Sequence, residues 1–332
     1  MGVATPSSHQ RDALAANNSF AVAMRKRLLP PITLALIIPF LTELLSGNTP
    51  APAFIRPWTY AMLVLAYGVP ALLIRDLFVR WRLALPGLFI LGLAYGIYNE
   101  GILAKTLLRS EGVPMNVFDH YSALGLNWPW AFLIVPWHAL LAIVFPISIV
   151  TWLFPKAGSE AWLSRGAFVA GFLIALFFGC FVFFVNPNFK ASPVYLVFFW
   201  AVIGLLILLS RLVPRGSSFL QPGGRATWGP LVAGFIFHPF FILGMCVLGG
   251  SHAPAFVICL VGTILLGAGY LPVTKRQWLA VTPFVLLALG NYLSASLFNL
   301  RGVCLKGSPS GILAALILIG FFAGCIRAVW RR

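Results

Sequence analysis

Acidic residues are scarce in this sequence, which has seven Asp and Glu among its 332 residues. Charged residues of both signs make up only 9% of the chain and apolar residues 60%, whereas soluble globular proteins have roughly 25% charged and roughly 45–50% apolar residues. So few charges do not keep a soluble globule of this size in solution. The mean hydropathy of +0.95 also excludes a disordered protein. The class that remains is a polytopic membrane protein.

Cysteine is scarce as well, with five residues that are scattered and form no CxxC pair. This pattern excludes a disulfide scaffold and a zinc finger. The net charge of +16 comes from 23 Lys and Arg that lie singly or in small groups between apolar runs. Such dispersal is typical of residues that flank membrane spans and not of a nucleic-acid surface. We therefore expect the lipid bilayer, and not nucleic acid, as the partner of this chain.

Long apolar runs are abundant instead. A spanning helix needs about 20 mostly apolar residues, and ten runs meet this requirement. They are 28–46, 58–75, 83–104, 130–154, 166–185, 193–213, 228–248, 253–273, 278–299 and 311–329. The sequence thus predicts an all-α fold, a bundle of about ten transmembrane helices.

The distribution of basic residues predicts the orientation of this bundle. With the N-terminus inside, 17 of the 23 Lys and Arg fall on inner segments and 6 on outer ones, as expected for cytoplasmic loops. We therefore predict a multi-pass protein of the cell (plasma or inner) membrane with both termini in the cytoplasm. Residues 1–27 are interpreted as a flexible cytoplasmic tail before an uncleaved first helix. Residues 28–332 are interpreted as a single integral membrane domain.

Ionisable groups inside spans are costly and therefore informative. Glu43 and Glu100 lie near the outer ends of the first and third runs, and His138 lies about two turns into the fourth. The alternating directions of these helices place all three residues in the outer third of the bilayer. Arg75 and Asp76 close the inner end of the second run, where we expect an interfacial pair. The shared depth of the first three residues predicts one polar site.

Glu100 has further support from its own helix. Gly92, Gly96, Glu100 and Ala104 are spaced four apart, so they form one stripe. Because two glycines at this spacing allow close helix approach, we expect the stripe, and Glu100 with it, to face protein. Asn99 precedes Glu100 as an accessory group.

Two further residues complete the list of binding candidates. His238 lies near the middle of the seventh run, where it is either a ligand or a packing residue. Asn291 on the ninth run, together with Ser294, is interpreted mainly as an interhelical hydrogen-bonding group.

The residues around Glu100 and His138 resemble motifs of the CPBP family, the type II CAAX-processing and bacteriocin-processing intramembrane metalloproteases. Residues 98–101 resemble the first motif with one Glu replaced by Asn99, and residues 134–138 resemble the second, with Ile134 where Phe is usual. The third motif, a His with Asn or Asp, is not found. The resemblance implies that Glu100 and His138 bind a divalent metal such as zinc and activate water. Residues 43–48 and 67–76 are also similar to uncharacterised bacterial multi-pass proteins.

Three functions remain open at this stage. One is secondary transport of a proton-coupled or small solute, with Glu43, Glu100 and His138 as a proton or cation relay. A second is a CPBP-like metal-dependent peptidase, which needs a third ligand from Glu43 or His238 because catalytic zinc normally has three protein ligands. A third is a non-catalytic membrane component that works with partner membrane subunits. The cofactor is unknown, and a metal is expected only for the peptidase.

Overall fold

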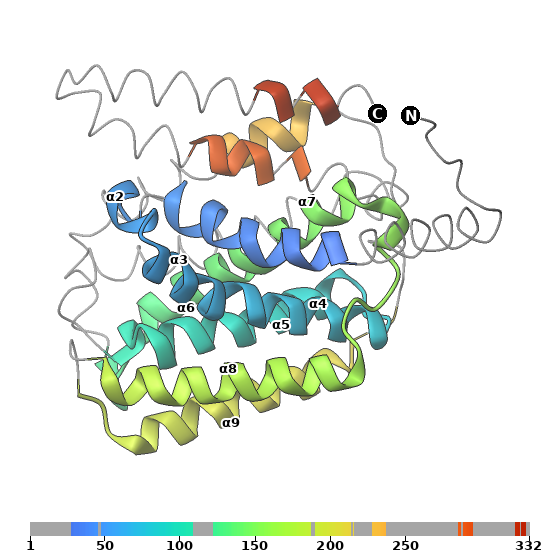
Figure 1. Cartoon of the computed structure of the whole chain (residues 1–332). Coiled ribbons are helices and arrows are strands. Elements are labelled where there is room, and N and C mark those ends of the chain that lie inside the picture. Colours follow the sequence, from blue (N-terminus) through green and yellow to red (C-terminus); the bar gives the residue numbers. More distant parts are fainter. Residues whose placement is uncertain are drawn as a thin grey trace, which may run out of the picture.

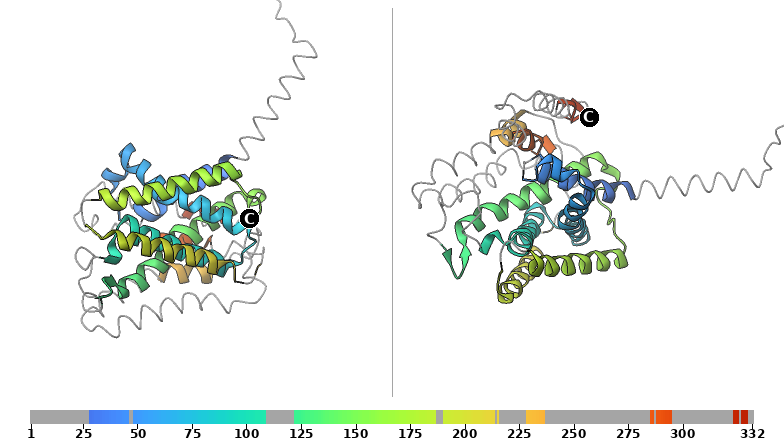
Figure 2. Two further views of the ribbon diagram at one scale, coloured as in Figure 1. Left: turned by 90° about the horizontal axis from the view of Figure 1, so that it is seen from below. Right: turned by 60° about the vertical axis from the view of Figure 1, so that its left-hand side comes forward.

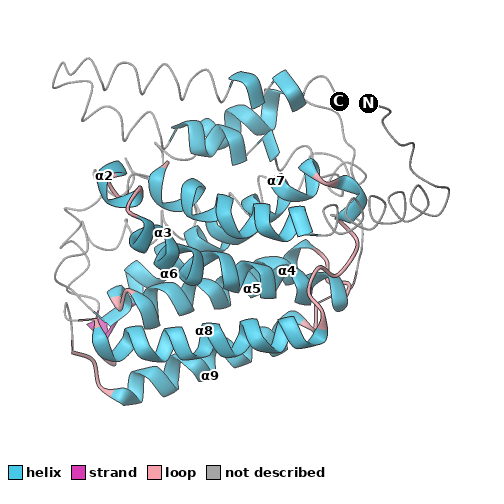
Figure 3. Ribbon diagram, in the orientation of Figure 1, coloured by secondary structure: helices cyan, strands magenta, loops and turns pink. Residues whose placement is uncertain are grey.

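The structure is a computed structural model of the chain. It describes residues 28–45, 48–108, 122–186, 190–213, 215, 228–236, 285–286, 288–294, 323–325 and 327–329. These residues are almost all helical (Figure 3). The one pair of strands that they contain is a two-residue hairpin, β1 (Ser122–Ala123) with β2 (Leu126–Asn127). Leu124 and Gly125 close it at φ 57° and 70°.

The helices run side by side as a bundle (Figure 1). The first helix, Leu28–Leu44, ends in the π-helical segment η1 (Phe40–Leu44). The remaining elements are listed here in chain order: α2 (Ala51–Phe54), α3 (Pro57–Leu63), η2 (Val64–Gly68), α4 (Val69–Arg80), α5 (Leu85–Ile97), η3 (Tyr98–Leu103), η4 (Thr106–Leu108), α6 (Trp128–His138), η6 (Ala139–Val144), α7 (Phe145–Leu153), η7 (Pro155–Ala157), α8 (Arg165–Val185) and α9 (Pro193–Ser210).

Four continuous helices among the described residues are long and apolar enough to cross a membrane, namely Pro57–Arg80, Trp130–Leu153, Arg165–Val185 and Pro193–Ser210. Each coincides with a predicted run to within a few residues. The third predicted run forms the helix α5–η3, which is not among these four, and the first run forms a shorter apolar helix. Residues 1–27 and most of the last four predicted runs lie outside the described residues. The count of ten spans and the orientation of the termini thus stay predictions.

Helix α5 lies between α4, α6–η6 and α9 and contacts all of them. Its glycines allow this arrangement. A Cβ added at Gly92 meets Ala139 Cα at 2.9 Å, and one added at Gly96 meets Val135 O at 2.6 Å. The close approach expected at these two glycines is therefore confirmed, and the neighbour is the helix that carries His138.

Helices α8 and α9 lie along one side of the bundle (Figure 2). Each begins at a serine N-cap, because Ser164 accepts a hydrogen bond from Ala167 N and Ser192 accepts one from Val194 N. Most of their apolar side chains are exposed, Phe177 and Val194 strongly so. An exposed face this apolar is suited to hydrocarbon and not to water.

Arg75 and Asp76 on α4 are fully buried in the protein, and Arg75 Nη1 lies 3.7 Å from Asp76 Oδ1. The two residues thus form an ion pair, and its place at the membrane interface stays a prediction. The Arg75 guanidinium donates hydrogen bonds to the carbonyl oxygens of Ala157, Gly158 and Glu160, and it stacks on the Trp162 ring at 3.5 Å. Asp76 accepts from the backbone N–H groups of Trp162 and Leu163. The two charged side chains thus bind backbone carbonyl and N–H groups of the loop between α7 and α8 and hold this loop in place. The sequence alone does not show that the loop lies next to α4.

Candidate functional site

Four of the predicted site residues come together inside the bundle. Glu43, Asn99, Glu100 and His138 are each buried, with exposed fractions of 6–8%. Glu43 lies on the first helix, Asn99 and Glu100 on η3, and His138 at the end of α6. The structure thus brings together the three helices that carry Glu43, Glu100 and His138, the residues predicted to lie at one depth of the bilayer.

The centre of this cluster is the pair of Glu100 and His138. Glu100 Oε1 lies 3.4 Å from His138 Nε2. The other ring nitrogen, Nδ1, lies 3.1 Å from the carbonyl oxygen of Ile134. In the tautomer with hydrogen on Nδ1, the ring donates to this carbonyl and Nε2 faces the carboxylate. The two side chains form an ion pair when the imidazole is protonated.

The second oxygen of Glu100 is also engaged. The hydroxyl of Thr106 donates to Glu100 Oε2, and Trp130 Nε1 donates to the same hydroxyl oxygen at 3.0 Å. His138 thus supplies the compensating group near Glu100, while Arg56 is exposed. Thr106 and Trp130 were not recognised from the sequence, because Thr106 follows the predicted helix and reaches Glu100 only through the fold of η4.

Glu43 occupies a neighbouring branch of the cluster. Its Oε1 accepts a hydrogen bond from Tyr67, and its Oε2 accepts one from Thr49 at 2.6 Å. The Tyr67 ring stacks on the His138 ring, with centroids 6.5 Å apart and planes at 24°. Tyr67 therefore contacts both Glu43 and His138 and connects the surroundings of Glu43 to those of the Glu100–His138 pair.

Asn99, predicted as an accessory group, contacts Tyr95 on the preceding turn of the helix. Its amide nitrogen donates to the hydroxyl of Tyr95 at 2.9 Å, and that hydroxyl donates to Ala66 O at 3.3 Å. The Tyr95 ring lies 6.2 Å from the His138 ring. Asn99 thus orients the tyrosine beside the histidine. Tyr67 and Tyr95 were also missed from the sequence, and the signal that could have found them is their place as hydroxyl-bearing residues inside apolar runs.

Four polar residues of the site lie in a π-helical segment or directly beside one. Glu43 belongs to η1, Tyr67 to η2 and Glu100 to η3, while His138 immediately precedes η6. Short π-helical turns are rare and frequently occur at functional sites. Two of these turns follow a proline, Pro39 before η1 and Pro136 before η6, and a missing proline N–H disturbs the regular hydrogen-bond ladder.

The two residues predicted as metal ligands, Glu100 and His138, lie side by side here. A separation of 3.4 Å between Glu100 Oε1 and His138 Nε2 is compatible with two ligands on one zinc ion at bond lengths of about 2.0–2.2 Å. Within the ranges that the structure describes, no group of three His, Cys, Asp or Glu side chains is placed to share a metal ion. His238, one of the two residues expected to complete the set, lies outside the described residues.

Asn291 and Ser294 are fully buried on the short helical stretch 288–294. In the described part of the chain, the Asn291 amide and the Ser294 hydroxyl find no hydrogen-bond partner. The neighbouring Tyr292 hydroxyl donates to Leu141 O in η6. This stretch therefore packs beside the helix of His138, but a hydrogen bond between helices through Asn291 is not seen.

These observations define a class, a helical membrane protein with a buried acid–histidine pair held among π-helical turns. The comparison with known families agrees at this level. A family model described as an uncharacterised membrane protein family matches residues 32–332, and the chain belongs to that family. Neither a curated protein nor a solved structure matches it. The resemblance to the CPBP peptidases thus gains no support from these comparisons.

Proposed function

We propose that this protein is a secondary transporter that couples the movement of a small solute to proton binding at Glu100 and His138. The observation that carries the proposal is the burial of a carboxylate beside an imidazole, with Glu100 Oε1 3.4 Å from His138 Nε2. Buried acid and histidine side chains in membrane helices form proton relays in pumps and transporters. We place the protein in the cell membrane, with both termini in the cytoplasm.

Two further features favour transport. Glu43 is a second buried carboxylate, and Tyr67 links it to the wall of the His138 site. The π-helical turns interrupt the regular ladder in each of the helices that bear these groups. Interrupted membrane helices are typical of transporters, where they line the binding site. The arrangement therefore combines a proton-binding pair with helices that are locally irregular at the same depth.

The first test follows the proton itself. Infrared difference spectra of the purified protein, recorded across a pH titration, should show a carboxyl or imidazole band that is absent in Glu100→Gln and altered in His138→Gln. Glu160→Gln is the matched control, because Glu160 is an exposed acid outside the site. If Glu100→Gln and Glu160→Gln change the spectra equally, the pair holds no special proton and the proposal fails.

The second test follows transport. Vesicles that contain the wild-type protein and an internal pH dye should release protons on addition of solute mixtures, and Glu100→Gln should abolish this response. A response that persists in Glu100→Gln at the wild-type rate would contradict the assignment. Fractionation of an active mixture then identifies the solute.

The metal-dependent peptidase is the second candidate, favoured by the distance between Glu100 Oε1 and His138 Nε2. It predicts one tightly bound divalent ion per chain and its loss in both Glu100→Gln and His138→Gln. Elemental analysis of the purified protein distinguishes the two functions. Stoichiometric metal in the wild type that both variants lose would replace the transport proposal with this one.

A further inference from the structure

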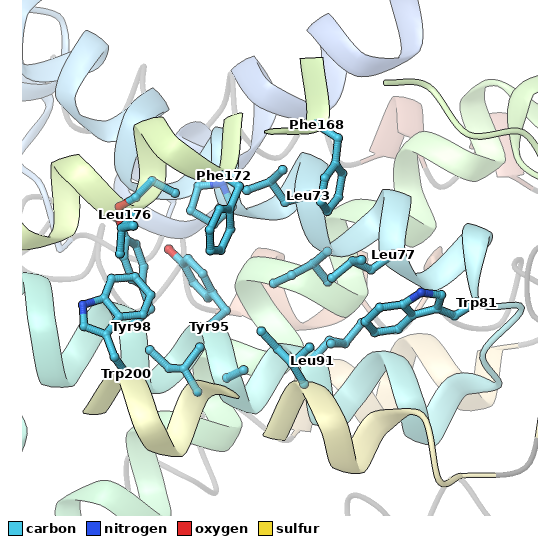
Figure 4. Close-up of a pocket in the computed structure, with 16 residues that line it drawn as sticks. Leu73, Leu77, Trp81, Leu91, Tyr95, Tyr98, Phe168, Phe172, Leu176 and Trp200 are labelled. Atoms are coloured by element: carbon cyan, nitrogen blue, oxygen red, sulfur yellow. Dashed lines mark hydrogen bonds between the residues drawn. The ribbon is translucent and has the colours of Figure 1, made fainter. Parts of the chain in front are cut away.

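An apolar cleft runs between helices α4, α5, α8 and α9 (Figure 4). One end of it reaches Tyr95, which also contacts Asn99 of the polar site. Its volume is about 220 Å³, and apolar side chains supply nearly all of its wall. Leu73 and Leu77 come from α4, Leu91 from α5, Phe172 from α8 and Ile203 from α9. Its lining is thus suited to a hydrocarbon chain.

The surroundings of this cleft are themselves apolar. Phe172 lines it and is 46% exposed, and the outer faces of α8 and α9 continue its wall. In a membrane these faces meet lipid tails, so the cleft is continuous with the hydrocarbon of the bilayer. The chain that enters it is therefore the tail of a membrane lipid.

A second cavity, of about 360 Å³, adjoins the cleft at the end of α4. It is lined by Arg80, Arg82, Arg211 and Arg215 together with Leu83, and Trp81 lines both cavities. The arginines converge because Leu83 and Arg215 form a β-bridge that ties the α4–α5 turn to the segment after α9. One residue, Trp81, thus joins a basic cavity to an apolar cleft.

The charge of the basic cavity is largely uncompensated. Arg80 pairs with Asp76 at 2.9 Å. Arg211 lies over the Trp81 ring at 5.0 Å, and among the described residues no carboxylate forms an ion pair with Arg82, Arg211 or Arg215. Three exposed guanidinium groups around one cavity match the charge and the bidentate hydrogen bonding of a phosphate.

We propose that the two cavities together bind one anionic phospholipid, with its phosphate among Arg82, Arg211 and Arg215 and one acyl chain along the cleft. Basic pockets between membrane helices bind anionic lipid headgroups on the cytoplasmic side. The arginine distribution predicts this end of the bundle to be cytoplasmic, and Trp81 has the position of an interfacial aromatic residue. The proposal is independent of transport at Glu100, because the phosphate cavity before the start of α5 is lined by neither Glu100 nor His138.

Native mass spectrometry of the full chain in detergent tests the proposal. The wild type should retain phosphatidylglycerol and release phosphatidylcholine with the same acyl chains. Hydrogen bonds to charged groups are worth enough that each arginine removed should weaken binding by about tenfold. The variant Arg82→Gln/Arg211→Gln/Arg215→Gln should therefore lose the lipid. Arg165→Gln is the matched control, because Arg165 is an exposed arginine at the start of α8 that lines neither cavity.

A second measurement needs no arginine variant. Phosphatidylglycerol with a photoactivatable group in its acyl chain should label peptides that contain Leu77 or Phe172 in the wild type, and Ile203→Trp, which fills the cleft, should reduce this labelling. Equal retention of the two lipids, or an unchanged affinity in the triple variant, would overturn the proposal. If inorganic phosphate displaces the lipid fully, the acyl cleft takes no part in binding the lipid. This result would overturn the proposal as well.

Discussion

Replacing Gly96 with alanine should push helix α5 away from α6. The new Cβ would lie 2.6 Å from Val135 O and 2.9 Å from Val135 Cα. Both neighbours are backbone atoms, which do not rotate aside as a side chain does. Since ordinary contacts of a Cβ begin near 3.4 Å, the two helices must separate by several tenths of an ångström. Overpacking of this kind costs typically about 1–3 kcal/mol.

The same displacement should reach the polar site. Glu100 follows Gly96 by one helical turn, and His138 follows Val135 on the opposing helix. A separation of 3.4 Å between Glu100 Oε1 and His138 Nε2 leaves little room for lengthening before the contact is lost. Gly96→Ala should therefore weaken both the fold and the contact between Glu100 and His138, although it alters no polar atom.

Gly204→Ala on α9 is the matched control. No atom lies within 4 Å of a Cβ added there, and alanine favours a helix over glycine by roughly 0.5–1 kcal/mol. Unfolding of both variants in mixed micelles with a graded denaturing detergent, followed by infrared titration, measures the two effects. If Gly96→Ala is as stable as Gly204→Ala and keeps the wild-type bands, the close contact does not support the site.

Two further substitutions address groups with defined partners. Tyr67→Phe removes the donor to Glu43 Oε1 and leaves a buried carboxylate oxygen short of one hydrogen bond, so we expect a loss of about 1–3 kcal/mol in the free energy of unfolding. The control is Tyr60→Phe, at the partly exposed end of the same span. Equal losses in the two variants would contradict the role of Tyr67. Arg75→Met removes hydrogen bonds to three backbone carbonyls, while Asp76 keeps Arg80 as a partner. We therefore expect a loss of about 3 kcal/mol, at about 1 kcal/mol for each hydrogen bond, and faster proteolysis of the loop 155–164, neither of which should appear in Arg165→Met.

The sequence was sufficient to predict the long apolar helices among the described residues, because composition determines them. It also singled out Glu43, Glu100 and His138 as ionisable groups inside apolar runs, and the structure places them in one buried cluster. Their depth in the bilayer stays a prediction. The stripe of Gly92, Gly96 and Glu100, spaced four residues apart, also indicated the buried face of α5 correctly. Small residues at that spacing allow another helix to approach closely.

Other parts of the site were beyond such reasoning. A π-helical turn changes which residues share a face, and no apolar period reveals it in advance, so the contact of Tyr67 with both Glu43 and His138 was not foreseen. Thr106 reaches Glu100 through a short turn whose course depends on packing. Arg75 was predicted to pair with Asp76 at the interface, but its hydrogen bonds to carbonyl groups of a loop some 80 positions later were not foreseen.

The arrangement around Arg75 has a mechanical consequence. Because its guanidinium binds the loop 157–160 while Asp76 binds the start of the next segment, α4 and this loop are held together at two points. The π-helical turn η2 lies at the other end of α4. Under the transport proposal, we expect α4 to move about η2 while the end at Arg75 stays in place.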